Sequence, residues 1–179
     1  SASCEFEFIT IERTLRGLVW DEEGQVWLSE FQTNNLPNYK KLSEALDTPL
    51  ASATYAEDGL LYAASLNTDD LVSGLYTIDE NSFEVNKIGD SSIGYTDLSP
   101  APSLGGDKLL ATYGTYIVIV DRVGGDYLGA FNMASFTGNR NIVALAYEEQ
   151  YDHPNYGLTD WVFFIDTAGN LYETGFLPY

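Results

Sequence analysis

The 179-residue sequence predicts an all-β, antiparallel fold built from repeats, and three observations support this. Strand-sized apolar segments recur in four stretches, whose aligned starts are 35, 45 and 46 residues apart. Turns rich in Asp, Gly and Asn separate these segments, as in β-hairpins. Helical spacing of apolar residues is nearly absent, and only residues 39–46 fit either a short helix or a connection to a strand. Each repeat has room for about four strands of ordinary length.

Each repeat opens with a hairpin, in which an apolar strand, an acidic or Gly-containing turn and a second strand follow one another. These hairpins occupy residues 17–28, 53–63, 98–113 and 142–165, with a long acidic loop inside the fourth. A further hairpin follows in the later repeats, at residues 75–88, 117–131 and 163–172. In these, Asp ends the first strand. Its side chain is expected to cap the turn, while Gly or Asn adopts a positive φ.

The turn pattern resembles the Asp-x-x-Gly-x-Leu-Tyr repeats of β-propellers from bacterial secreted and cell-surface proteins. The segments that carry the resemblance are Asp21–Trp27, Glu57–Tyr62 and Asp166–Tyr172. The resemblance implies one repeat domain over residues 1–179, with blade-sized units at about 14–50, 51–94, 95–138 and 139–179. These units form either a closed four-bladed ring or part of a larger ring. A two-sheet β-sandwich is the alternative fold.

Residues 1–13 are expected to contribute an additional strand to this domain. The segment Glu5–Glu12 alternates apolar and polar residues in the way a half-buried strand does. Open sheet edges are normally paired or covered, so this strand is expected to close the ring by pairing with the last blade.

The acidic composition excludes several classes of partner. Asp and Glu total 27 against 8 Lys and Arg, which gives a formal net charge of -19. Nucleic acid and anionic membranes both require clustered basic residues, so neither is an expected partner. No apolar run approaches the ~18 residues of a membrane span, so membrane insertion is not expected. The acidic, Tyr-rich and Lys-poor composition favours an extracellular or cell-surface location, and the oligomeric state stays open.

One acidic segment is the best candidate for a metal site. The predicted loop 148–155 brings Glu148, Glu149 and Asp152 together with an amide and a histidine. Calcium binds oxygen ligands with flexible geometry, so these three residues are the predicted ligands if calcium is bound. Solvated turn acids are the alternative interpretation.

Aromatic residues in the second half of the chain suggest a ligand-binding surface. Tyr151, Tyr156 and Trp161 flank polar segments, and Asp97 is expected near the centre of a propeller face. The alternatives are that the aromatic side chains pack between sheets and that Asp97 caps a turn at a strand edge. Flat rings with nearby carboxylates and amides are typical of sugar-binding and peptide-binding sites. His153 is the single histidine and is predicted to be an exposed surface residue. No nucleophile elbow or other catalytic arrangement accompanies it.

These observations favour a non-catalytic binding or adhesion module that recognises a glycan or a cationic protein surface. A negative protein attracts positive partners, which supports the second ligand class. A carbohydrate-active enzyme, with Asp or Glu as acid and base on the top face, is one alternative. A structural spacer in a larger surface protein is the other.

Overall fold

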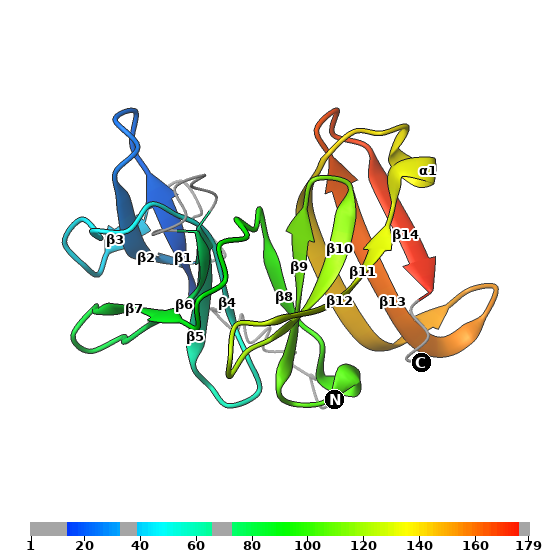
Figure 1. Ribbon diagram of the computed structural model, residues 1–179, viewed down its shortest axis with the longest axis horizontal. Helices are drawn as coiled ribbons and strands as arrows, with labels where there is room; N and C mark the ends of the chain where they lie inside the picture. The colour runs from blue at the N-terminus through cyan, green and yellow to red at the C-terminus, as the bar shows by residue number, and fades with distance from the viewer. Residues whose placement is uncertain (1–13, 33–38, 66–72, 176–179) are drawn as a thin grey trace, which may run out of the picture.

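The fold consists almost entirely of antiparallel β-sheet. The computed structural model describes residues 14–32, 39–65 and 73–175 (Figure 1). Within these ranges, strands form four separate sheets, and helix is limited to the 3-10 turn η1 (Pro102–Leu104) and the single turn α1 (Ala134–Thr137). The prediction of an all-β, antiparallel fold is confirmed. Four sheets also rule out the two-sheet sandwich as a description of this chain.

The first two sheets contain the first half of the chain, and each keeps its strands in chain order. Sheet 1 consists of β1 (Thr14–Trp20), β2 (Val26–Gln32) and β3 (Tyr39–Lys41). Sheet 2 consists of β4 (Leu50–Tyr55), β5 (Leu61–Ser65), β6 (Gly74–Ile78) and β7 (Val85–Ile88).

The other two sheets repeat this order in the second half of the chain. Sheet 3 consists of β8 (Leu98–Pro100), β9 (Lys108–Tyr113), β10 (Tyr116–Asp121) and β11 (Tyr127–Asn132). Sheet 4 consists of β12 (Ile142–His153), β13 (Gly157–Asp166) and β14 (Leu171–Gly175).

The four sheets are arranged like successive blades. The first strand of each sheet contacts the first strand of the next, from β1 to β4, from β4 to β8 and from β8 to β12. In Figure 1, sheets 1 and 2 lie on the left, sheet 3 lies in the centre and sheet 4 lies on the right. Each sheet then extends outward from this row of first strands, in chain order.

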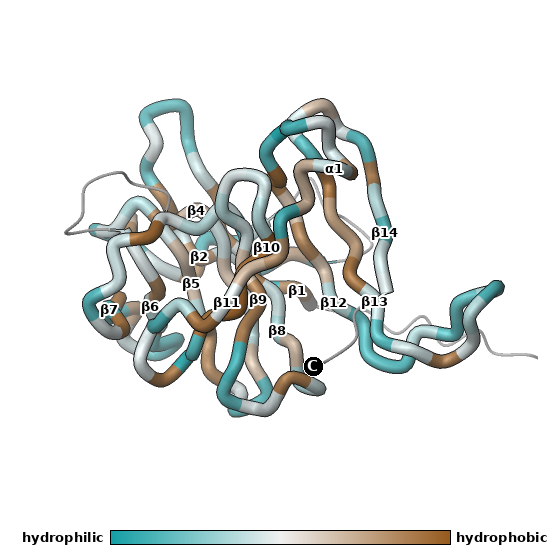
Figure 2. The backbone as a smooth tube through the Cα atoms, turned by 45° about the vertical axis from the view of Figure 1, so that its right-hand side comes forward, coloured by the Kyte–Doolittle hydropathy of each residue, from teal (hydrophilic) through white to brown (hydrophobic). Residues whose placement is uncertain are grey.

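The hydrophobic core is divided into three clusters, one between each pair of neighbouring sheets. Strand β5 shows how the sequence produces this division. Leu61 and Ala63 pack toward sheet 1, whereas Tyr62 and Ala64 pack toward sheet 3. Successive side chains of a strand point to opposite faces, so a blade between two others is buried on both. In Figure 2 hydrophobic colour follows the inner strands, and the hairpin tips are mainly hydrophilic.

The hairpin turns have the side-chain capping that the sequence predicts. In the β1–β2 turn, Asp21 Oδ1 accepts hydrogen bonds from the backbone N–H groups of Glu23 and Gln25, at 3.0 and 2.8 Å. Gly24 in the same turn has a φ of 79°. The carboxylate thus satisfies two backbone donors that the turn would otherwise leave to water.

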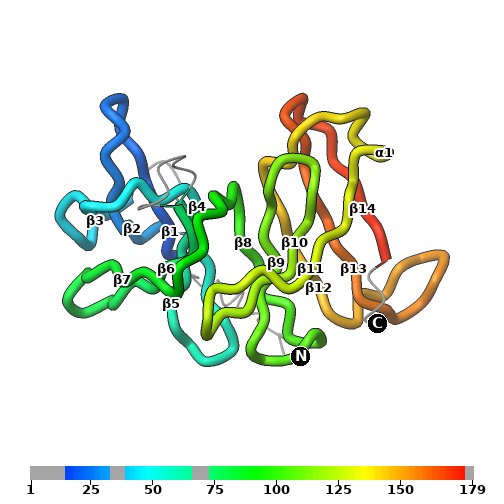
Figure 3. The backbone as a smooth tube through the Cα atoms, viewed as in Figure 1, coloured from blue at the N-terminus to red at the C-terminus, as the bar shows by residue number. Residues whose placement is uncertain are grey.

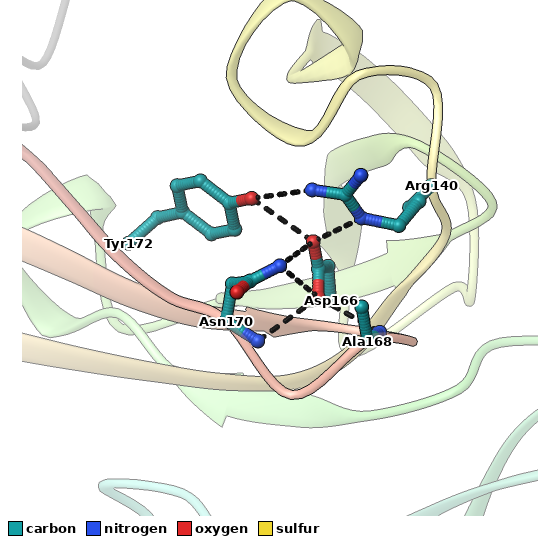
Figure 4. A network of polar contacts seen from close by, with 5 residues as sticks. All are labelled: Arg140, Asp166, Ala168, Asn170 and Tyr172. Atoms are coloured by element: carbon teal, nitrogen blue, oxygen red, sulfur yellow. Dashed lines mark hydrogen bonds and ion pairs between the residues drawn. The ribbon is translucent and has the colours of Figure 1, made fainter.

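The β13–β14 turn adds an ion pair to the same capping arrangement (Figure 4). Asp166 Oδ1 accepts from the backbone N–H groups of Ala168 and Asn170, at 2.9 and 3.0 Å. Its Oδ2 accepts from Arg140 Nε at 2.6 Å and from the Tyr172 hydroxyl at 2.9 Å. Burial raises the pKa of Asp166, but hydrogen bonds from Asn170, Arg140 and Tyr172 outweigh it and hold this pKa well below its ordinary value.

Residues 39–46 are not helical. They begin with β3, and the backbone N–H groups of Leu42 and Leu46 then donate to the carbonyl oxygens of Leu28 and Val26, at 2.8 and 2.7 Å. Both leucines pack against the core between sheets 1 and 2. The competing interpretation, a connection to a strand, is therefore correct, because pairing with β2 partly buries both leucines without a helix.

The expected strand Glu5–Glu12 and its pairing lie outside the described residues. None of the helices in the described ranges has the length and apolar character needed to cross a bilayer.

Candidate functional site

The predicted acidic loop 148–155 is part of a long hairpin. Strand β12 continues through His153, and β13 begins at Gly157, so residues 148–153 are paired rather than looped. The loop prediction is wrong because, within this polar run, the side chains of Tyr151 and His153 lie two residues apart on one face of a strand. Figure 3 shows the tip of this hairpin, in orange, projecting from the right-hand end of the molecule.

A β-bulge in β12 sets which side chains share a face. Glu148 pairs with Trp161 and Tyr151 pairs with Thr159, so two residues of β12 face Asp160 alone. Gln150 in the bulge has a φ of 50°, and its N–H donates to Asp160 Oδ1 at 3.0 Å. The extra residue reverses the alternation. Without it, Tyr151 would point to the opposite face from Trp161.

Asp160 is held in place as the acceptor for this bulge. The Tyr147 hydroxyl donates to Asp160 Oδ2 at 2.8 Å and also contacts the Ser103 hydroxyl. Burial raises the pKa of Asp160, whereas hydrogen bonds from Ser103, Gln150 and Tyr147 lower it, and the net pKa lies below its ordinary value. Asp160 is therefore a stable carboxylate that fixes the bulge.

The tip of the hairpin is a tight turn that orients His153. The N–H of Tyr156 donates to the His153 carbonyl at 3.1 Å, and Pro154 occupies the position where its fixed φ favours such a turn. The N–H of Asn155 donates to His153 Nδ1 at 3.1 Å. Because Nδ1 accepts this hydrogen bond, the neutral imidazole carries its proton on Nε2.

Four rings gather on one face of this hairpin: Tyr151, His153, Tyr156 and Trp161, here called the aromatic cluster. His153 stacks on Trp161 with 4.2 Å between centroids and 11° between planes. Tyr156 lies 4.8 Å from His153 and 5.9 Å from Trp161. Tyr151 meets Trp161 edge-on at 6.2 Å. The structure thus brings together three residues that the sequence marks as ligand-binding.

A cavity of about 430 Å³ opens beside the aromatic cluster. It is lined by Tyr156, Thr159, Trp161, Glu173, Thr174 and Gly175. Tyr156 is 73% exposed, whereas Trp161 is only 6% exposed, so one ring is free and the other forms a firm base. Glu173 on β14 is half exposed, and its Oε1 lies 3.6 Å from His153 Nε2. The lining residues therefore combine aromatic faces, three hydroxyls and one carboxylate.

His153 and Glu173 are the site residues that the sequence analysis missed. The prediction of an exposed surface histidine is wrong, because the ring is 7% exposed under the stack with Trp161. The alternation of Tyr151 and His153 was the available signal, since residues two apart share a strand face. Glu173 had no such signal, because its position depends on the β13–β14 register.

Asp97 lies elsewhere and ties three sheets together. Its Oδ1 accepts from Ser52 Oγ at 2.6 Å and from the N–H of Leu98 at 2.9 Å. Its Oδ2 accepts from the N–H of Leu145 at 2.8 Å. Strands β4, β8 and β12 thus share one carboxylate, and Asp97 is not among the residues that line the cavity beside the aromatic cluster.

Replacing Asp97 by Asn tests this structural position. The Asn side chain has one acceptor oxygen, so it cannot accept hydrogen bonds at both of the positions that Oδ1 and Oδ2 of Asp97 occupy. Tm is therefore expected to fall by about 3–10 °C, while ligand affinity at the aromatic cluster is unchanged. Calorimetry and a binding titration on the same sample measure both quantities. Loss of binding at unchanged Tm would instead return Asp97 to the ligand site.

The three predicted calcium ligands do not converge. Glu148 shares the face of Trp161, Glu149 lies in the bulge, and Asp152 points to the other face because it pairs with Leu158. In the part of the chain that the structure describes, no three His, Cys, Asp or Glu side chains are grouped to hold a metal ion. Calcium binding stays a prediction.

Comparison with known proteins informs the fold only. Neither a protein family nor a curated protein matches the sequence. A chain of the nidogen/laminin complex is similar in structure, with a TM-score of 0.59 and 12% identity over 91% of this chain and 58% of that chain. This likeness supports the β-propeller-like fold that the arrangement of sheets indicates.

Two further solved structures are more distant. The WD40 domain of SCAP from fission yeast has a TM-score of 0.47 and 10% identity, over 95% of this chain and 47% of that chain. An extracellular domain from B. thetaiotaomicron has a TM-score of 0.40 and 16% identity, over 88% of this chain and 19% of that chain. The chain spans 58% or less of the length of each of these three structures.

Proposed function

We propose that this chain is a non-catalytic, extracellular or cell-surface binding module whose aromatic cluster receives a cationic group of a protein partner. The group is a lysine ammonium or an arginine guanidinium. It binds between the exposed face of Tyr156 and the carboxylate of Glu173, above the buried ring of Trp161.

The observation that carries this proposal is the position of Glu173 beside aromatic faces. A cation over an aromatic ring gains about 0.5–2 kcal/mol, and more of this is realised where the site is desolvated. Glu173 and Glu148 both lie on the strand face that carries Trp161, because they pair with Phe163 and Trp161 across the sheet.

The charge of the whole chain favours the same ligand class. A net charge of -19 raises the local concentration of positive partners and speeds their association. The matched nidogen/laminin structure is a complex between proteins, which agrees with a protein ligand. A neutral glycan, the other ligand class predicted from the sequence, can donate hydroxyl hydrogen bonds to a carboxylate, but the net charge does not attract it.

A titration with a short lysine-rich peptide and with tetramethylammonium tests the proposal. Binding is expected to change the fluorescence of Trp161. Raising the salt concentration from 50 to 500 mM shortens the Debye screening length about threefold and is expected to weaken binding. Tyr156→Ala and Glu173→Gln are each expected to lower the affinity on the order of tenfold.

Glu23→Gln is the matched control, since it removes the same charge from an exposed turn on sheet 1 and is expected to leave affinity unchanged. A neutral oligosaccharide serves as the competing ligand. If binding of the oligosaccharide depends on Tyr156 and the cations do not bind, the ligand is a glycan and the proposed cationic site is wrong. Equal weakening by Glu23→Gln and Glu173→Gln would indicate general attraction without a site.

A further inference from the structure

A second aromatic surface lies on sheet 3, separate from the aromatic cluster. A groove of about 360 Å³ is lined by Ile93, Tyr113, Tyr116, Val118, Tyr127 and Ala130, here called the tyrosine groove. The three tyrosines are 40 to 53% exposed. Half-exposed aromatic side chains gathered on one face often mark an interaction site.

The strand register explains why these residues meet. Tyr113 and Tyr116 pair across the tight β9–β10 turn, and Val118 pairs with Ala130 of β11. A register shift in β11 then places Tyr127 opposite Val120, on the same face. The groove therefore follows β10, with two tyrosines at one end and a third at the other.

The spacing of these tyrosines fits an extended ligand. Tyr116 and Val120 are four residues apart on β10, which places the two ends of the groove about 13 Å apart at ~3.3 Å per residue. A polyproline II helix rises about 3.1 Å per residue, so roughly four of its residues span this length. Val118 and Ala130 form an apolar floor between the ends.

The charge of the groove also restricts its ligand. None of the six lining residues is charged, although 20% of the chain is Asp, Glu, Lys or Arg. The groove therefore suits an uncharged ligand segment. Outside it, the net charge of -19 favours basic flanks and disfavours acidic ones.

We propose that the tyrosine groove binds a proline-rich segment of a protein partner, in polyproline II conformation and with basic flanking residues. Proline rings pack between the tyrosines, and this helix has no internal hydrogen bonds, so its carbonyl oxygens can accept from the tyrosine hydroxyls. Its low conformational entropy before binding reduces the free energy lost on ordering. This site is independent of the cationic site on sheet 4.

The test is a calorimetric titration with a decapeptide that has six central prolines and two lysines at each end. Saturable binding is expected. Replacing the prolines by alanine is expected to weaken it at least tenfold, and glutamate flanks are expected to weaken it further. Equal affinity for the proline and alanine peptides, or saturable binding of a neutral oligosaccharide in their place, overturns the proposal.

Variants locate the binding. Tyr116→Ala and Tyr127→Ala are each expected to weaken it about tenfold, as for aromatic residues at the centre of an interface. Tyr127→Phe keeps the ring and is expected to lose only a few-fold. Tyr39→Ala, a similarly exposed tyrosine on β3, is expected to change nothing. Tyr156→Ala in the aromatic cluster is expected to remove binding of the lysine flanks there and to leave the proline-dependent part of the binding unchanged. Binding that survives both groove variants with folded protein refutes the site.

Discussion

Replacing Asp166, which caps the β13–β14 turn, by Ala is expected to lower Tm on the order of 10 °C. The side chain is buried, and its loss leaves the N–H groups of Ala168 and Asn170 without their acceptor. It also removes the acceptor shared by Arg140 and the Tyr172 hydroxyl, which keep only the hydrogen bond between them. Thermal unfolding followed by circular dichroism measures the change.

Lowering the pH is expected to reduce the difference in Tm between the wild-type protein and the Asp166→Asn variant. The folded-state pKa of Asp166 lies below the value near 3.9 of an unfolded Asp. The charged form therefore stabilises the fold fully above the unfolded pKa, and this contribution is lost as pH falls from there toward the folded pKa. The gap in Tm is expected to be widest at pH 7 and narrower at pH 3. A gap that is constant over this range would exclude the ionised carboxylate as its source.

Asp21→Ala is the matched control for Asp166→Ala. Asp21 caps the equivalent turn on sheet 1 through two backbone N–H groups, but no hydrogen bond from an arginine to it is found among the described residues. Its loss is expected to lower Tm by only about 2–4 °C, the usual effect of a lost cap. Equal effects of the two variants would show that the Arg140 and Tyr172 contacts add nothing.

These two aspartates also show what the sequence can and cannot predict about this fold. Capping by Asp, with Gly at positive φ, depends on residues within five positions, so the sequence contains all of it. The Arg140 contact joins Asp166 to a segment 26 residues earlier and depends on sheet 4 being assembled. Phe83 marks another limit, because it adopts a φ of 61° where a turn would favour Gly or Asn.

In the aromatic cluster, too, some features can be predicted from nearby residues and others depend on strand register. The sequence marks Tyr151, Tyr156 and Trp161 as candidate binding residues from their type and their polar neighbours. Their convergence depends on the bulge at Gln150, a one-residue change of register that composition does not reveal. The burial of His153 follows from that register. Predicting residues 148–155 as a loop therefore led to the wrong prediction that the histidine is exposed.

Gly89→Ala is expected to be the most damaging glycine substitution that the contacts between sheets predict. Gly89 follows β7 and has a φ of 63°, and an added Cβ would lie 1.9 Å from the carbonyl oxygen of Gly124 in the β10–β11 turn. Both atoms belong to the closely packed boundary between sheets 2 and 3. Separating the two backbones would disturb the core there, so a loss of Tm above about 10 °C, or failure to fold, is expected.

Gly24→Ala isolates the contribution of the contact in Gly89→Ala. Gly24 has a similar φ of 79°, but an added Cβ would meet no atom within 4 Å. Its substitution therefore carries only the left-handed backbone penalty of about 1 kcal/mol, equivalent to a few degrees in Tm. The difference between the two variants measures how tightly sheets 2 and 3 approach each other. Similar losses in both would mean that backbone conformation alone requires glycine at position 89, and that the boundary between the blades can yield.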